Sequence, residues 1–186
     1  MPFLTTDIPG LLVFEPKVFE DSRGYFFESF NEKNFREHGI DIKFVQDNES
    51  SSQYGVVRGL HYQLAPHAQA KLIRVFEGTI LDVVVDVRKG SPTFGRSFSL
   101  ELTGANKKQL FIPEGFAHGF SVLSEKAVVF YKCSGFYNKE SEAGIRYDDP
   151  QLNIDWKVPA SKAIISDKDK LLPFLSHSKA NFDYNH

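Results

Sequence analysis

Leu81-Asp82-Val83-Val84-Val85-Asp86-Val87 is the stretch of this sequence that decides the fold. β-Branched residues at this density favour a β-strand. Successive side chains of a strand point to opposite faces, so the two aspartates share one face and four apolar residues share the other. This run therefore predicts a central strand of a β-rich protein.

Further strand-like stretches surround this run, and turn-forming residues such as Pro9-Gly10, Lys89-Gly90-Ser91-Pro92 and Pro113-Glu114-Gly115 separate them. The segments that we expect to form strands are 12–15, 25–30, 72–77, 80–87, 97–102, 109–112, 118–122 and 127–136. Helical signal is limited to two segments. Residues 31–38 have Asn31 as a cap and Gly39 as a stop, and residues 166–175 predict a turn or two. About eight strands with two short helices predict an all-β jelly roll that holds a ligand between its sheets.

Length and composition point to an ordinary globular protein. With 186 residues, the chain is expected to form a single domain over residues 1–186, with an irregular tail after about residue 175. The 18 phenylalanines and 7 tyrosines fit a ligand cavity, although a Phe-rich core alone also explains most of them. A net charge of −2 with mixed signs predicts no nucleic-acid partner.

The compartment is also suggested by the sequence. Cys133 is the only cysteine, so no intramolecular disulfide can form, which suits a reducing environment. The segment from Met1 to Asp7 has neither the basic nor the apolar region of a leader peptide. No apolar run approaches the roughly 18 residues of a membrane span. We therefore expect a cytoplasmic protein without membrane contact.

His61 lies in Arg58-Gly59-Leu60-His61-Tyr62-Gln63, and Lys71 follows ten residues later. A histidine in a strand is most often structural or exposed. Here Arg58 and Lys71 flank it with few carboxylates nearby, and cations favour the neutral imidazole that acts as a base. Strand alternation places His61 and Gln63 on one face, and Gly59 permits a close backbone approach.

A metal site built from His61, Gln63, His67 and His118 is a second interpretation. Metal-binding barrels of this type usually show His-x-His followed by a glutamate. Position 63 is glutamine, and residues 68–72 contain no carboxylate. We therefore expect no metal ion.

Two further residues have a structural and a catalytic interpretation. Alternation places Val129, Tyr131 and Cys133 on one face, so Tyr131 is either a hydrogen-bonded core residue or an acid at a cavity wall. The segment Ser166-Asp167-Lys168-Asp169 reads as a solvated loop. Alternatively, an aspartate from this loop folds back against His61 and fixes the tautomer of the imidazole.

Several motifs occur together in one order: Arg58-Gly59-Leu60-His61-Tyr62-Gln63, Ala68-Gln69-Ala70-Lys71-Leu72, Ser91-Pro92-Thr93-Phe94-Gly95, Ile112-Pro113-Glu114-Gly115-Phe116-Ala117-His118-Gly119-Phe120 and Ser166-Asp167-Lys168-Asp169. From about residue 12 to residue 173, the chain resembles the dTDP-4-dehydrorhamnose 3,5-epimerase family. The resemblance implies a cupin-like double-stranded β-helix, or jelly roll, with short peripheral helices. It also implies a homodimer that works without a metal or an organic cofactor.

The implied substrate is dTDP-4-dehydro-6-deoxy-D-glucose, whose C4 ketone acidifies the protons on C3 and C5. By this resemblance, His61 removes those protons in turn and Asp169 pairs with His61. Lys71, helped by Arg58, stabilises the enolate oxygen. Tyr131 returns a proton from the opposite face, so that each centre is inverted and the product is dTDP-4-dehydro-L-rhamnose.

The resemblance also implies the binding residues. Those expected to contact the nucleotide or line the substrate site are Arg23, Phe26, Glu28, Gln46, Asn48, His118, Tyr137, Glu142 and Lys168. Tyr137 is the expected stacking partner of the thymine. In the family the N-terminal strand crosses to the partner subunit, so the first three of these residues are expected in the partner's pocket.

Three other functions stay open at this point. The nearest is an epimerase that acts on C3 alone or C5 alone of a related dTDP-4-keto-6-deoxysugar. More distant are a metal-dependent cupin and a non-catalytic sugar-binding cupin.

Overall fold

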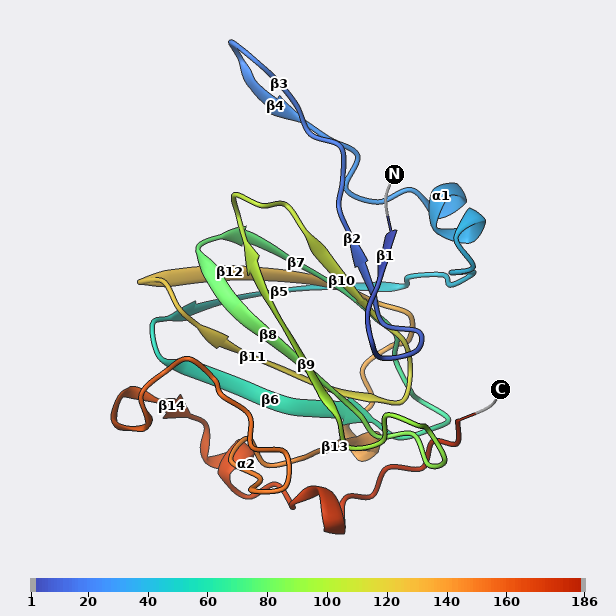
Figure 1. The fold of residues 1–186 in the computed structure, drawn as a ribbon, viewed down its shortest axis with the longest axis vertical. Helices are drawn as coiled ribbons and strands as arrows, with labels where there is room; N and C mark the ends of the chain where they lie inside the picture. Colours follow the sequence, from blue (N-terminus) through green and yellow to red (C-terminus); the bar gives the residue numbers. More distant parts are fainter. Residues whose placement is uncertain (1–2, 185–186) are drawn as a thin grey trace.

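Two β-sheets face each other in the computed structural model, which describes residues 3–184 (Figure 1). In spatial order, the first sheet consists of β1 (Phe3–Thr5), β2 (Leu12–Phe14), β10 (Gln109–Ile112), β7 (Lys71–Glu77), β12 (Lys126–Cys133) and β5 (Gln46–Gln53). The second consists of β13 (Glu142–Gly144), β6 (Val56–Gln63), β11 (Phe116–Val122), β8 (Thr79–Asp86) and β9 (Ser97–Thr103), with β14 (Ile164–Ile165) parallel to β6. All other pairings between these strands are antiparallel, and the predicted jelly roll is confirmed.

The remaining elements are peripheral. A separate hairpin, β3 (Phe19–Asp21) and β4 (Gly24–Phe26), projects away from the sheets (Figure 1). The helices are α1 (Glu32–Glu37), α2 (Asp167–Lys170) and three 3-10 turns at Lys139–Ser141, Ala160–Lys162 and Leu175–His177. The predicted cap is confirmed, because the Asn31 side chain accepts hydrogen bonds from the first turn of α1. Among the described residues, no helix is long and apolar enough to cross a membrane.

The expected strands are largely confirmed, and two were drawn too long. The segment 27–30 leaves the sheet, because Phe30 packs against Phe35 and Phe44 near α1. Residues 134–136 form a loop after β12 ends at Cys133. The long strand β6 and the short strands β1, β3, β13 and β14 lie outside the expected segments. The strand β5 was also missed, since its sequence Gln-Asp-Asn-Glu-Ser-Ser-Ser-Gln carries no apolar alternation. It pairs with β12 alone at the sheet edge, where polar residues are tolerated.

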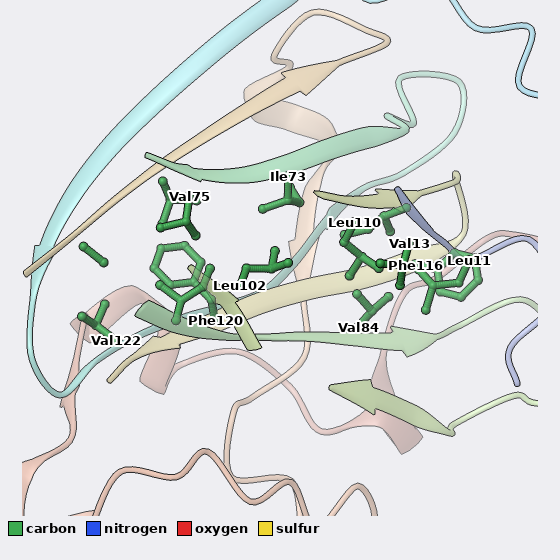
Figure 2. Close-up of a cluster of buried hydrophobic side chains, with 14 of the residues drawn as sticks. Leu11, Val13, Ile73, Val75, Val84, Leu102, Leu110, Phe116, Phe120 and Val122 are labelled. Carbon is green, nitrogen blue, oxygen red and sulfur yellow. The ribbon is translucent and has the colours of Figure 1, made fainter. Parts of the chain in front are cut away.

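Apolar side chains from both sheets fill the space between them. Figure 2 shows this core, with Ile73 and Leu110 from the first sheet and Val84 and Phe120 from the second. A second core lies on the outer face of β8, where Leu81, Val83, Val85 and Val87 pack under the C-terminal segments. Both faces of β8 are therefore buried, as is typical of a central strand.

The two aspartates of β8 lie on the inner face and are fully buried. A buried carboxylate requires partners. Burial raises the pKa of Asp86, but its hydrogen bonds with Arg88, Ser91 and Thr93 outweigh this effect and bring the pKa below the ordinary value. The Ser91-Pro92-Thr93 motif thus stabilises the fold. The other aspartate, Asp82, contacts His118.

Candidate active site

Two adjoining cavities, of about 520 and 350 Å³, open at one end of the space between the sheets. His61, Lys71 and Tyr131 line both of them. His61 belongs to β6 in the second sheet, whereas Lys71 and Tyr131 belong to β7 and β12 in the first. The imidazole and the phenol therefore approach the shared space from facing walls.

A close contact between two glycines places His61 in the cavity. Gly59 has a φ of +118°, and a Cβ there would lie 2.6 Å from the Cα of Gly119. The register between β6 and β11 shifts at this point, and such irregularities re-aim neighbouring side chains. His61 and His118, which are paired across the two strands, both line the larger cavity. The close approach expected at Gly59 is confirmed.

Asp169 contacts His61, as the second interpretation of its loop expected. The Nε2 atom of His61 lies 2.7 Å from Oδ1 of Asp169, whose side chain is almost completely buried. The other carboxylate oxygen accepts the Gly59 N–H, and Ser166 caps the short helix α2 that carries Asp169. Burial raises the pKa of Asp169, but its hydrogen bond with His61 and the His61 charge outweigh this effect and leave the pKa below its usual value.

An ionised Asp169 determines which nitrogen of His61 is free. The carboxylate only accepts hydrogen bonds, so the imidazole donates through Nε2–H. No described residue bonds to Nδ1, which leaves that nitrogen as the available base.

Lys71 carries a cation next to this base. Burial lowers the pKa of its amine, and the charges of Cys133, Asp82 and Glu142 oppose that effect. Among residues 3–184, no carboxylate lies within ion-pair distance of the amine. In its protonated form, an amine without an ion-pair partner at the cavity wall attracts an anionic oxygen of a bound molecule.

Tyr131 does not behave as the hydrogen-bonded core tyrosine of the first interpretation. Its ring packs against the main core, but the described part of the chain supplies no hydrogen bond to its hydroxyl. Burial, and to a smaller extent the neighbouring Cys133 thiol, raise the pKa of Tyr131, and Arg58 opposes them. A protonated phenol directed at a cavity can donate a proton.

Asp82 and Ser52 support the site but were not predicted. Asp82 Oδ1 lies 2.7 Å from Nε2 of His118, and its other oxygen has no partner among the described residues. Ser52 Oγ accepts two hydrogen bonds from Arg58. Asp82 could have been predicted as a site residue, because a carboxylate is unusual inside the apolar 81–87 run. Ser52 could not, because the sequence of β5 is polar throughout.

The smaller cavity gathers four of the expected nucleotide and substrate residues, which are Gln46, Asn48, Tyr137 and Glu142. The Tyr137 hydroxyl donates to Glu142 at 2.9 Å, and Glu142 forms an ion pair of 2.5 Å with Lys168. Arg58, His118 and Lys168 line the larger cavity. The tertiary structure thus brings most of the predicted residues together.

Three predicted residues lie elsewhere. Arg23 and Phe26 belong to the projecting hairpin, where Arg23 pairs with Asp21 and Phe26 is 71% exposed (Figure 1). Glu28 accepts hydrogen bonds from Asn31 and Asn34 at the start of α1. None of them lines either cavity of its own chain, so their expected role in the partner's pocket stays a prediction.

The second interpretation of the sequence was a metal site built from His61, Gln63, His67 and His118. Within residues 3–184, no group of three or more His, Cys, Asp or Glu side chains is arranged to hold a metal ion. His67 is exposed and contributes its backbone carbonyl to Gln63.

Fold and site together define a jelly-roll protein whose cavity carries the groups of acid–base chemistry. The chain belongs to the dTDP-4-dehydrorhamnose 3,5-epimerase family, whose model matches residues 5–177, and is an isomerase.

Known relatives resemble this chain over most of its length. The dTDP-4-dehydrorhamnose 3,5-epimerase of Shigella flexneri is 54% identical over 170 residues, which cover 91% of this chain and 93% of the relative. The solved epimerase of Elizabethkingia anophelis is 51% identical, with a TM-score of 0.92 over 95% of this chain and 97% of that one. The dTDP-6-deoxy-D-glucose-3,5-epimerase of Legionella pneumophila, solved with dTDP-4-keto-L-rhamnose, is 47% identical, with a TM-score of 0.95 over 100% and 99% of the chains.

Proposed function

We propose that this protein inverts C3 and C5 of dTDP-4-dehydro-6-deoxy-D-glucose to give dTDP-4-dehydro-L-rhamnose, a step of dTDP-L-rhamnose biosynthesis, without a metal or an organic cofactor. The single observation that carries this proposal is His61 of the second sheet, paired with Asp169 of α2, facing Tyr131 of the first sheet across a shared cavity. The product bound in the Legionella pneumophila relative supports the choice of substrate.

Each inversion is a pair of proton transfers. Nδ1 of His61 removes the proton from the carbon beside the C4 ketone, and the electron pair moves onto the ketone oxygen. Asp169 stabilises the imidazolium, while Lys71, helped by Arg58, stabilises the enolate oxygen. Tyr131 then delivers its proton to the opposite face of the carbon, the ketone re-forms, and solvent returns both groups to their starting protonation states. The sequence occurs once at C3 and once at C5, with no net redox change.

The smaller cavity is assigned to the nucleotide half of the substrate. Gln46 and Asn48 offer amides, and the half-exposed ring of Tyr137 offers a surface on which thymine stacks. His118, Glu142 and Lys168 are assigned to the walls around the sugar and the diphosphate.

Deuterium exchange tests the whole proposal. Proton NMR of dTDP-4-dehydro-6-deoxy-D-glucose in D₂O, with chelator-treated protein, should show deuterium entering both C3 and C5. Exchange at only one carbon would make the protein a single-site epimerase. A stoichiometric ion that is lost together with activity would instead support a metal-dependent cupin.

We also infer a homodimer in which the hairpin of one subunit completes the pocket of the other. The hairpin exposes Phe19, Tyr25 and Phe26 and makes few contacts with its own sheets. Exposed aromatic rings grouped in this way mark interaction surfaces. Light scattering should give twice the 21.1 kDa mass of the chain.

Mixing two inactive variants tests the shared site. Arg23→Ala and His61→Asn subunits, unfolded and refolded together, should recover about a quarter of wild-type activity, because half of the randomly formed dimers are mixed and each of these has one intact site. Refolding each variant alone is the control. If the mixture is no more active than the separate variants, Arg23 does not serve the partner's pocket.

A further inference from the structure

The loop that carries Tyr137 is held by glutamine side chains from three different segments. Gln69 Nε2 donates to the Gly135 carbonyl at 2.6 Å, and Gln46 Oε1 accepts the Tyr137 N–H at 3.0 Å. Gln63 makes two of the bonds, since its Nε2 donates to the Phe136 carbonyl at 3.2 Å and its Oε1 accepts the Asn138 N–H at 2.7 Å. Every residue from 135 to 138 therefore has a backbone group bonded to a glutamine.

Gln63 occupies the central position in this arrangement. Its side chain is 6% exposed, and its Nε2 also donates to the His67 carbonyl at 2.6 Å. Both amide hydrogens and the amide oxygen are thus engaged by backbone groups. Such an amide holds two chain segments together and leaves no donor for a ligand.

The loop depends on these bonds for its conformation. Residues 134–138 lie between β12 and a short 3-10 turn and have no strand pairing of their own. Tyr137 is 57% exposed, and within the described part of the chain its hydroxyl forms a single hydrogen bond, to Glu142. A segment with so little packing gains conformational freedom when its polar contacts are removed.

Strand β6 also links this loop to the chemistry. Gln63 follows His61 by two residues, so both side chains lie on the same face, and both line the smaller cavity. The same strand thus positions the base and, through Gln63, the loop that holds the Tyr137 ring.

We propose that Gln63 is a positioning residue that fixes Tyr137 as a platform for the nucleotide base, with Gln69 as a secondary support. This inference rests on the proposed function, in which Tyr137 stacks on the thymine of the substrate. Gln63 then raises the affinity for the nucleotide only indirectly, by holding the loop of residues 134–138 that carries Tyr137.

Gln63→Met tests this role, because methionine has a similar length but no amide. The dissociation constant of dTDP, measured by calorimetry, and the KM should both rise about tenfold, as loss of base stacking would produce. kcat should change by less than about threefold, since His61, Tyr131 and Asp169 are untouched. The matched control is Gln53→Met at the exposed end of β5, which should alter none of these values. An unchanged dTDP affinity in a folded Gln63→Met protein would overturn the proposal.

A double-mutant cycle separates this effect from a general loss of structure. Tyr137→Ala alone should weaken dTDP binding about tenfold or more, and Gln63→Met should add nothing in that background. Fully additive effects would mean that Gln63 does not act through Tyr137. If Tyr137→Ala leaves dTDP affinity unchanged, the nucleotide assignment itself is wrong. If Gln63→Met does not fold, Gln69→Met removes the Gly135 bond from outside the strand and should raise the same two constants to a smaller extent.

Discussion

Replacing His61 with asparagine is expected to abolish deuterium uptake at both C3 and C5 while leaving the affinity for dTDP close to that of the wild-type protein. Among residues 3–184, His61 is the histidine that lines both cavities, and the buried carboxylate of Asp169 lies behind it. Loss of a general base typically lowers the rate by about 10²–10⁴-fold. Because His61 removes the proton at both carbons, the two exchange rates should fall together.

Asparagine is the appropriate replacement because it retains a donor for Asp169. Alanine would remove the imidazole that pairs with the buried Asp169 carboxylate and leave it only the Gly59 N–H. The unpaired carboxylate oxygen would then destabilise the fold in addition to the loss of catalysis. His177→Asn, at an exposed histidine on the last 3-10 turn, is the matched control and should retain full activity. Retained exchange in His61→Asn would remove His61 from the role of base.

Replacing Tyr131 with phenylalanine is expected to reduce formation of the epimerised product by about 10²–10⁴-fold, and initial deuterium uptake by much less. Deprotonation by His61 comes first, so the enolate still forms and can take up deuterium from the His61 side. Only inversion requires a proton from the opposite wall. The measurement follows deuterium content by NMR and product by coupling to a rhamnose-forming reductase.

This substitution should also leave the fold intact. The phenol ring packs against the core, whereas its hydroxyl has no hydrogen-bond partner in the described part of the chain, so removing it leaves no buried group unpaired. Tyr54→Phe, at a more exposed tyrosine, is the control. Equal loss of uptake and inversion in Tyr131→Phe would mean that Tyr131 shapes or polarises the site and does not act as the acid.

Much of the architecture was predictable because strand signals are local. The alternation in residues 81–87 identified the central strand, and seven further stretches were located with errors mainly at their ends. The cap at Asn31 was also visible, since a cap depends only on neighbouring residues. By contrast, the polar strand β5 depends on a partner far along the chain, β12, and was not visible.

The sequence by itself determined the jelly-roll class, the family and the identity of the candidate base, lysine and phenol, because apolar alternation and short motifs are written in consecutive residues. Only the tertiary structure decided which of these groups meet. Asp169 reaches His61 across 108 residues, and Asp82 reaches His118 from a neighbouring strand. Gln63 of β6 holds the loop that carries Tyr137, more than 70 residues further along the chain. Such contacts depend on how two sheets face each other and where the loops cross them, and a hydrogen bond between distant side chains leaves no periodic trace along the chain.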